Sequence, residues 1–253
     1  KFQDKLIDSK MAASHIKKIH TTLSAVFKHA ILNEYTKDNP AAIVGNVDIK
    51  ETKHVNFWTL EEFKEFIKFV DDELYYSLFM TLYYSGMRKG ELLALTWADL
   101  DFTTNTINVD KTEYNRKVTT TKTESSRRKI LMPRFVMLLL EKIKLQRNPK
   151  INHVVFGDFH DSISTTTLDR RYDKYIAESK VKRIRIHDFR HSHASYLINK
   201  GTIISVIASR LGHGDVATTL NTYSHLYPTT EKEAVLDMEN DFKGATVIDL
   251  KAQ

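Results

Sequence analysis

Cysteine is absent from the chain of 253 residues. Its absence excludes a disulfide framework, a thiolate metal site and a cysteine nucleophile, and it fits an intracellular protein without fixing the compartment. No apolar run approaches the roughly 20 residues that a membrane-spanning helix needs. The first residues, KFQDKLIDSK, also lack the apolar stretch of a secretory signal peptide. We therefore expect a soluble protein with no membrane partner.

Positive charge exceeds negative charge: 38 Lys and Arg residues stand against 32 Asp and Glu residues, which gives +6 and a pI of about 9.2. The basic residues fall into groups, namely Lys17 with Lys18, Arg127 with Arg128 and Lys129, and Lys182 with Arg183 and Arg185. A solvated surface is the commoner origin of any one group. Here three basic groups lie close in sequence to candidate catalytic residues, and this favours a nucleic-acid partner instead.

The chain divides into a small helical part and a larger domain. From Ser14 to Ala30 apolar residues recur at steps of three and four, which predicts a helix that ends near Asn33, ahead of Pro40. One such helix cannot bury a core alone, and the chain starts with Lys1, so we expect a fragment of a longer protein. We place the helical part at residues 1–45, a linker at 46–57, the larger domain at 58–228 and a tail at 229–253.

The larger domain is predicted to be mainly α with a small antiparallel β-sheet, an α+β class. A capping box, Thr59 with Glu62, opens its first helix, and a buried helix ends near Gly86. Strands are predicted at Thr106 to Val109, in RKILMP before Pro133, and at His153 to Phe156, with Lys122 at a hairpin tip between the first two. Further helices are expected at residues 88–95, 135–145 and 165–178.

The stretch from His187 to Tyr223 carries the densest chemistry. On a helix that starts near His187, Arg190 shares the face of that histidine, and His191 lies one position around. Gly201 is suited to end this helix, and Gly212 to make a turn that exposes His213. A last helix, capped by Asp215 or Thr218, then carries Tyr223. The helix between the glycines is expected to be a core element through five apolar residues: Ile203, Ile204, Val206, Ile207 and Leu211.

Each of these residues also has an ordinary structural interpretation. A single tyrosine or histidine on an amphipathic helix is usually a half-buried packing or hydrogen-bonding group, and Arg88 can simply pair with Glu91. His187 and His191 have the spacing of a helical zinc pair. However, Asp188 stands where a zinc protease needs its glutamate, and there is no cysteine to complete a site, so we do not predict a metal.

Five motifs in order resemble the tyrosine recombinases, also called phage integrases. They are GMRKGELLALTW around Arg88, TKTESSRRKI around Lys122, HDFRHSHASYL around His187, LGH at His213 and TTLNTYSH around Tyr223, and they span residues 58–227. KDNPAAIV near the start resembles the end of the helical core-binding domain of that family. The resemblance implies the tyrosine recombinase catalytic fold, preceded by part of that DNA-binding domain. Phe189, where the family more usually has leucine, is a small departure.

The resemblance also implies catalytic roles. Tyr223 would attack a DNA phosphate and form a 3′-phosphotyrosine, while Arg88 and Arg190 hold the phosphate oxygens. His187 would accept the tyrosine proton, His213 would bond the phosphoryl group, and Lys122 would protonate the leaving 5′-oxygen. In this reaction a phosphodiester is exchanged for a phosphotyrosine ester and then for another phosphodiester, so the energy of the bond is retained. The resemblance therefore implies neither ATP, nor a metal, nor another cofactor. The sequence accordingly contains no phosphate-binding glycine loop and no convincing acidic cluster for magnesium.

The implied partners are double-stranded DNA with attachment sites, three further copies of the chain in a homotetramer, and accessory DNA-bending or directionality proteins, in a bacterial cytoplasm. Candidate DNA contacts are Lys17, Lys18, Lys28, Arg127, Arg128, Lys182 and Arg183. We expect the tail segment Val247 to Leu250 to dock on a neighbouring protomer. Alternatives are a type IB topoisomerase, a dimer-resolving recombinase and a catalytically idle DNA-binding relative.

Overall fold

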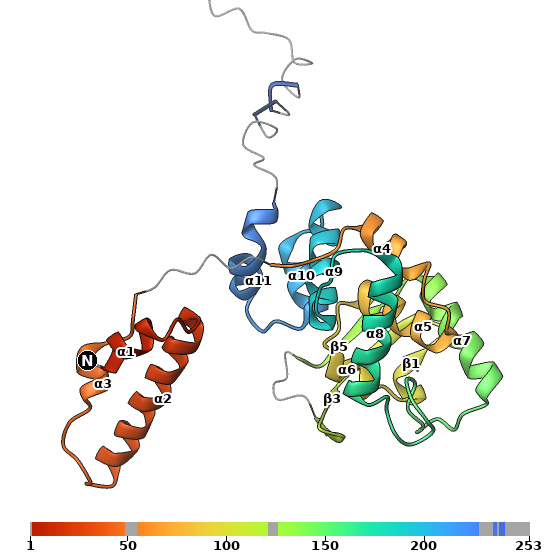
Figure 1. The fold of residues 1–253 in the computed structure, drawn as a ribbon. Coiled ribbons are helices and arrows are strands. Elements are labelled where there is room, and N and C mark those ends of the chain that lie inside the picture. Colours follow the sequence, from red (N-terminus) through yellow and green to blue (C-terminus); the bar gives the residue numbers. More distant parts are fainter. Residues whose placement is uncertain (1, 49–54, 121–125, 228–234, 237, 241–253) are drawn as a thin grey trace, which may run out of the picture. The chain divides into compact units, whose positions relative to one another are not determined.

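The computed structural model describes residues 2–48, 55–120, 126–227, 235–236 and 238–240. Two compact units, Lys1–His54 and Val55–Gln253, make up the chain (Figure 1). The predicted hairpin-tip residue Lys122 and the predicted docking segment Val247 to Leu250 lie outside the described residues. Among the described residues, no helix has the length and apolar character needed to cross a membrane.

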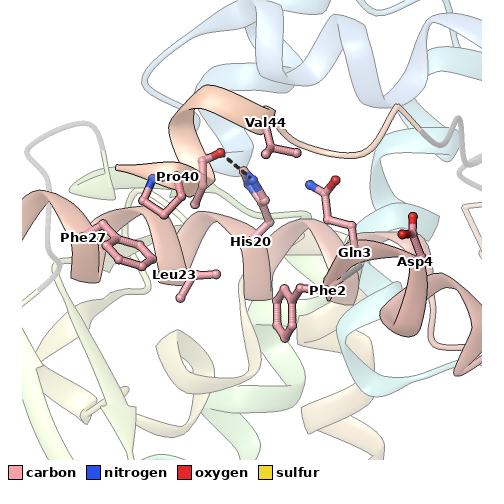
Figure 2. A pocket seen from close by; sticks show the side chains of 9 residues that line it. Phe2, Gln3, Asp4, His20, Leu23, Phe27, Pro40 and Val44 are labelled. Atoms are coloured by element: carbon pink, nitrogen blue, oxygen red, sulfur yellow. Dashed lines mark hydrogen bonds between the residues drawn. The ribbon is translucent and has the colours of Figure 1, made fainter. Parts of the chain in front are cut away.

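Residues 2–48 of the first unit form three helices: α1 (Phe2–Asp8), α2 (Ala13–Leu32) and α3 (Pro40–Val44). Helix α2 confirms the predicted helix and ends at the cap residue Asn33. Helix α3 begins because Pro40 suits a first helical position and the Asn39 side chain accepts a hydrogen bond from the amide of Ala42 at 3.0 Å. Buried His20 connects the two helices through a 3.0 Å bond to the Ala41 carbonyl oxygen (Figure 2).

An apolar pocket of about 540 Å³ opens between these helices (Figure 2). Its lining comprises Phe2, Gln3, Asp4, His20, Leu23, Phe27, Pro40, Ala41 and Val44. Among the described residues of this unit, the buried side chains are Ala13, Ile16, His20 and Ala41. The unit therefore has little core of its own, as the single strong helix in the sequence predicts.

The second unit is mainly helical. Its helices are α4 (Leu60–Ile67), α5 (Glu73–Ser85), α6 (Lys89–Leu93), α7 (Arg134–Arg147), α8 (Thr165–Ser179), α9 (Phe189–Asn199), α10 (Ile204–Leu211) and α11 (Val216–Tyr223), with short 3-10 turns η1 (Trp97–Asp99), η3 (Ile186–Asp188) and η4 (Ser224–Leu226). The predicted capping box is present, because the Thr59 hydroxyl accepts from the amide of Glu62 and the Glu62 carboxylate accepts from the amide of Thr59. Helix α5 ends, as predicted, where Gly86 takes a left-handed conformation.

The sheet is small and antiparallel, as predicted. Strands β1 (Leu100–Asp101), β2 (Thr106–Val109) and β5 (Arg128–Leu131) pair in the order β1-β2-β5. A separate hairpin of β3 (Lys111–Tyr114) and β4 (Lys117–Thr120) was not predicted, because its side chains are polar and largely exposed and show no apolar alternation. The predicted strand at His153 to Phe156 is wrong: Val154 makes only an isolated bridge to Thr96.

The described residues of the second unit form two clusters of buried side chains. The larger is rich in aromatic rings, with Phe63 stacked on Tyr83 at 3.9 Å between ring centroids and Phe189 of α9 packed on Phe79 of α5. The smaller comprises Ala194, Ile198, Ile207, Leu211 and Tyr223, where α9, α10 and α11 pack together (Figure 1).

Helix α10 corrects one sequence-based expectation. Ile207 and Leu211 are buried as predicted, but the side chains of Ile203 and Val206 are 66% and 43% exposed. The helix is short and presents a single face to the core, so apolar residues outside that face remain in solvent.

Gly86 and Gly201 provide a matched test of packing. Both have a positive φ, but a Cβ on Gly86 would lie 2.6 Å from the His193 ring and 2.9 Å from Leu211, whereas a Cβ on Gly201 would meet no atom within 4 Å. Gly201→Ala is expected to lower the free energy of unfolding by about 1 kcal/mol. Gly86→Ala is expected to lower it by roughly 3 kcal/mol, because overpacking is added. Urea unfolding followed by Trp58 and Trp97 fluorescence measures both, and equal losses would contradict the packing argument.

Candidate active site

The site is assembled from four segments that are distant in sequence. Arg88 is the N-cap residue of α6, Arg190 lies in the first turn of α9, His213 follows the left-handed Gly212 after α10, and Tyr223 ends α11. The charge of Arg190 acts on His213 and Tyr223, and the charge of Arg88 acts on His213 and Arg190. The structure therefore brings these predicted residues together.

Arg190 is a buried cation held by two helix ends. Its side chain is 3% exposed, and it donates to the carbonyl oxygen of Gly86 at 2.9 Å and to that of Leu211 at 2.6 Å. Within the described residues, these hydrogen-bond partners are neutral groups at the C-terminal ends of α5 and α10. Burial, together with the charge of Arg88, lowers the pKa of the guanidinium, which still remains protonated at neutral pH. Its hydrogen-bond partners among the described residues carry no charge, although the charge of Glu91 also acts on it, and such a desolvated cation favours binding of an anion.

Glu91 fixes the position of Arg88. The carboxylate of Glu91 is 2% exposed and accepts from the Arg88 guanidinium at 2.7 Å and from the Arg88 amide at 2.9 Å. It also binds Arg128 of β5 at 2.8 Å. These charges hold the pKa of Glu91 below its ordinary value against the opposing effect of burial. Arg88 is thus paired, as the structural interpretation expects, yet its side chain remains 38% exposed and lines an open pocket.

Arg128 corrects a sequence-based expectation. It was a candidate DNA contact, but its side chain is 7% exposed and also donates to the Arg210 carbonyl oxygen at 2.7 Å. A Cβ on Gly212 would lie 2.8 Å from its guanidinium, so this glycine allows the close approach. Arg128 therefore connects β5 with the end of α10 and with Glu91 instead of forming part of the surface.

Tyr223 is 1% exposed, and burial raises its pKa to about 12. Its hydroxyl lies 2.7 Å from Nδ1 of His191. The predicted proton acceptor, His187, has no hydrogen bond with this hydroxyl in the structure, and its role stays a prediction. His187 lies in the 3-10 turn η3, is exposed, and stacks edge-on against His191 with 5.7 Å between ring centroids. The helical spacing rule does not apply there, because α9 begins only at Phe189.

His213 is held by the helix that carries Tyr223. Its Nδ1 lies 2.7 Å from the hydroxyl of buried Thr219 on α11, which fixes the ring plane. Burial, followed by the charges of Arg190 and Arg88, lowers the pKa of His213 to about 4. The ring is therefore neutral at pH 7, and the nitrogen opposite Nδ1 is free of this bond.

A polar pocket of about 700 Å³ adjoins the site. Its walls come from the start of α6, the β3–β4 hairpin, α8 and η3, and its lining includes Arg88, Lys89, Arg183, Arg185 and His187 together with acidic Glu113, Asp169 and Asp173. His187 thus faces the same space as Arg88. Among the described residues, no group of three His, Asp or Glu side chains has a metal-binding arrangement.

The other predicted DNA contacts lie on the surface. Lys18, Lys28 and Arg127 are exposed, and Lys17 is half-buried. Lys182 pairs with Glu62 at 3.2 Å and Arg183 pairs with Asp173 at 2.8 Å, and both keep side chains that are 55% exposed. Their role in DNA binding stays a prediction.

Sequence reasoning missed two functional candidates, His191 and Asp188. Asp188 is fully buried and accepts from the amide and the guanidinium of Arg185. The available signal was the pair of histidines four residues apart with an aspartate between them, which was weighed only as a possible zinc motif.

Comparisons with known proteins agree on one family. The phage integrase family matches residues 56–230. The ICEBs1 integrase of Bacillus subtilis (strain 168) is 35% identical over 247 residues, which are 92% of this chain and 67% of that protein. The integrase of Staphylococcus phage L54a is 26% identical over 236 residues, 83% of this chain and 66% of that protein. This chain therefore spans about two thirds of the length of these relatives.

Solved structures share the fold. The Tn1549 transposon integrase in complex with transposon right end DNA superposes with a TM-score of 0.74 at 23% identity, covering 94% of this chain and 82% of that one. A lambda integrase dimer bound to a core site gives 0.64 at 16% identity, with coverage of 87% and 61%.

The Glu91 network gives a pH-dependent prediction. Glu91→Gln leaves Arg128 buried without its anion and is expected to lower the free energy of unfolding by about 3 kcal/mol at pH 7. Because the folded pKa of Glu91 is lowered, its contribution is present above pH 4.5 and is lost as the pH falls through the folded value, so the difference should shrink in acid.

The matched control is Glu65→Gln, which removes an exposed pair with Lys68. It is expected to change stability by less than about 1 kcal/mol. Urea unfolding at several pH values, followed by tryptophan fluorescence, compares the two variants. Equal small losses would show that the buried network does not stabilise the site.

Proposed function

The chain belongs to the phage integrase family of tyrosine recombinases, and from this premise we propose that it is the site-specific integrase of a mobile genetic element. It cuts and rejoins double-stranded DNA at attachment sites through a 3′-phosphotyrosine on Tyr223. The relatives that support a mobile element are the ICEBs1 integrase and the Tn1549 transposon integrase. The same chemistry serves integration and excision.

The observation that carries this proposal is the buried guanidinium of Arg190, whose charge acts on the buried Tyr223. Arg88 and Arg128 share the buried carboxylate of Glu91, while Arg190 donates to the neutral carbonyl oxygens of Gly86 and Leu211. A phosphodiester bound there supplies the missing anion, and guanidinium groups match its oxygens in geometry. The charge that develops on the phosphorus oxygens in the transition state then lies against preorganised cations.

The other residues take roles around the phosphate. His213, neutral and oriented by Thr219, donates a hydrogen bond to a phosphate oxygen from its free nitrogen. His187, in the pocket beside Arg88, contacts the DNA on the phosphate side of the site. Lys122 protonates the leaving 5′-oxygen. No step requires a cofactor, because one phosphate ester is exchanged for another.

DNA contacts and assembly complete the proposal. Residues 1–45 act as part of a DNA-binding domain, with Lys17, Lys18 and Lys28 of α2 at the duplex, and the second unit adds Arg127, Lys182 and Arg183. Strand exchange between two duplexes needs four active sites, so the working form is a homotetramer, assisted by DNA-bending or directionality proteins. The Tn1549 integrase complexes with DNA support the DNA partner.

The role of Tyr223 as nucleophile is tested by trapping the covalent protein–DNA intermediate. A duplex is selected from a randomised pool by repeated binding to the Tyr223→Phe protein, and nicked forms of it are incubated with each variant. The wild type is expected to give a covalent protein–DNA band on a denaturing gel. Tyr223→Phe should abolish the band and keep DNA affinity, because the nucleophilic oxygen is lost and the ring remains.

Tyr227→Phe is the control, since it removes a hydroxyl four residues further along and should keep the band. A band that survives Tyr223→Phe would show that another residue is the nucleophile. Failure to select any sequence, together with cleavage of unrelated duplexes by the wild type, would favour a type IB topoisomerase.

The α2 contacts are tested through salt dependence. Each phosphate contact adds about 0.9 to the slope of log affinity against log salt concentration. Lys28→Gln should therefore reduce that slope by about 1 on the selected duplex, whereas Lys28→Arg should leave it unchanged. Fluorescence anisotropy at several salt concentrations measures the slope, and an unchanged slope for Lys28→Gln would remove this residue from the interface.

A further inference from the structure

His191 lies between the Tyr223 hydroxyl and a buried carboxylate. Its Nδ1 is 2.7 Å from the Tyr223 oxygen, and the two rings meet at 63° with 5.6 Å between centroids. On the opposite side, its Nε2 is 4.0 Å from Oδ1 of Asp188. That distance is too long for a hydrogen bond but short enough for a strong electrostatic effect in a buried site.

The carboxylate decides which nitrogen of His191 carries the proton. With hydrogen on Nε2, the N–H dipole points toward the Asp188 carboxylate, whereas the other tautomer places a lone pair against that negative charge. Asp188 is itself held in place, because it accepts from the amide of Arg185 at 2.9 Å and from its guanidinium at 2.8 Å. The favoured tautomer leaves Nδ1 unprotonated, so the Tyr223 hydroxyl is the donor in the 2.7 Å bond.

We propose that His191 is the catalytic group that accepts the Tyr223 proton, and that Asp188 is the positioning residue that selects its acceptor tautomer. This assignment rests on the recombinase function proposed above. It places the general base one helical turn after His187, whose exposed ring in η3 contacts His191 edge-on.

The surroundings keep the His191 ring unprotonated. Burial lowers its pKa to about 4, with Asp188 opposing and His187, Arg185 and Arg190 adding to the shift. His213 also interacts electrostatically with it. The ring is therefore neutral at pH 7, while burial raises the pKa of Tyr223 to about 12. A bound phosphate between Arg88 and Arg190 adds negative charge beside the ring and so raises its proton affinity when substrate is present.

The proton and the bonds balance in one step. The Tyr223 oxygen forms a bond to phosphorus as its proton passes to Nδ1 of His191, and the bond from phosphorus to the 5′-oxygen breaks. The leaving oxygen keeps the electron pair and takes a proton from the general acid, proposed above to be Lys122. The proton moves as the bond forms, because tyrosine loses its affinity for it only as its oxygen becomes an ester oxygen. In religation His191 returns the proton.

The test compares two histidines by pH profile. Single-turnover cleavage of the selected nicked duplex is measured from pH 6 to 9 for the wild type, His191→Asn and His187→Asn. Asparagine places a polar atom near the Nδ1 position without a titratable group. His191→Asn is expected to be at least about 100-fold slower at pH 7, the usual size of general-base catalysis.

The diagnostic quantity is the ratio of wild-type to variant rate. For His191→Asn this ratio should fall as the pH rises. The variant has no base and depends on ionisation of Tyr223 by solvent, so its rate gains up to about tenfold per pH unit on the wild type. Titrations of other groups affect both proteins equally and cancel in the ratio. For His187→Asn it should stay constant. A constant ratio for His191→Asn, or a falling one for His187→Asn, would overturn the assignment. A wild type that forms no covalent complex would overturn the proposed function instead.

A second measurement does not depend on activity or on the stability of a His191 variant. Nitrogen-15 NMR of histidine-labelled wild type is expected to find His191 neutral at pH 7 with hydrogen on Nε2. Asp188→Asn, which removes the charge and keeps the shape, should increase the tautomer with hydrogen on Nδ1. A wild-type ring protonated on Nδ1 would contradict the proposal.

Discussion

The two hydrogen bonds that Arg190 donates to the carbonyl oxygens of Gly86 and Leu211 are the constraint on which the site depends. Helix C-termini present partial negative charge, so α5 and α10 can stabilise a buried guanidinium without a carboxylate. Left-handed Gly86 and Gly212 end these helices beside it. The charge of the Arg190 guanidinium therefore stays incompletely neutralised. Such a cation can still bind an anion, whereas an arginine that is neutralised by a carboxylate only joins two elements of the fold.

The neighbouring arginines illustrate that distinction. Glu91 neutralises Arg128 in the interior and leaves Arg88 38% exposed at the pocket. One carboxylate thus orients two cations but cannot cancel both, and Arg190 adds a third charge. Mutual repulsion among them opposes folding and is reduced when a phosphate enters, so ligand binding and stability of the site are linked. Burial, with the charge of Arg190 as a smaller contribution, keeps His213 and His191 neutral at pH 7.

Local sequence signals predicted the elements that hold the site, but not the finest geometry within it. Caps and periodicity located α2, the Thr59 capping box and the end of α5, because these depend on residues within one or two turns. The β3–β4 hairpin escaped because it is polar, and Arg128 was expected at the surface because its partner Glu91 lies in another element. The choice between His187 and His191 required knowledge that a 3-10 turn, and not an α-helix, contains His187.

That turn also explains how two histidines only four residues apart acquire different surroundings. Asp188 closes η3 by accepting from the Arg185 amide, and α9 starts at the next residue. The change of helix type leaves His187 exposed and turns His191, with 18% of its side chain exposed, toward Tyr223. Asp188 consequently has two effects from one position: it fixes the backbone that separates the histidines, and its charge favours hydrogen on Nε2 of the histidine that touches the Tyr223 hydroxyl. A motif with the family's histidine and arginine three residues apart therefore contains, in this chain, a further histidine placed by the same turn.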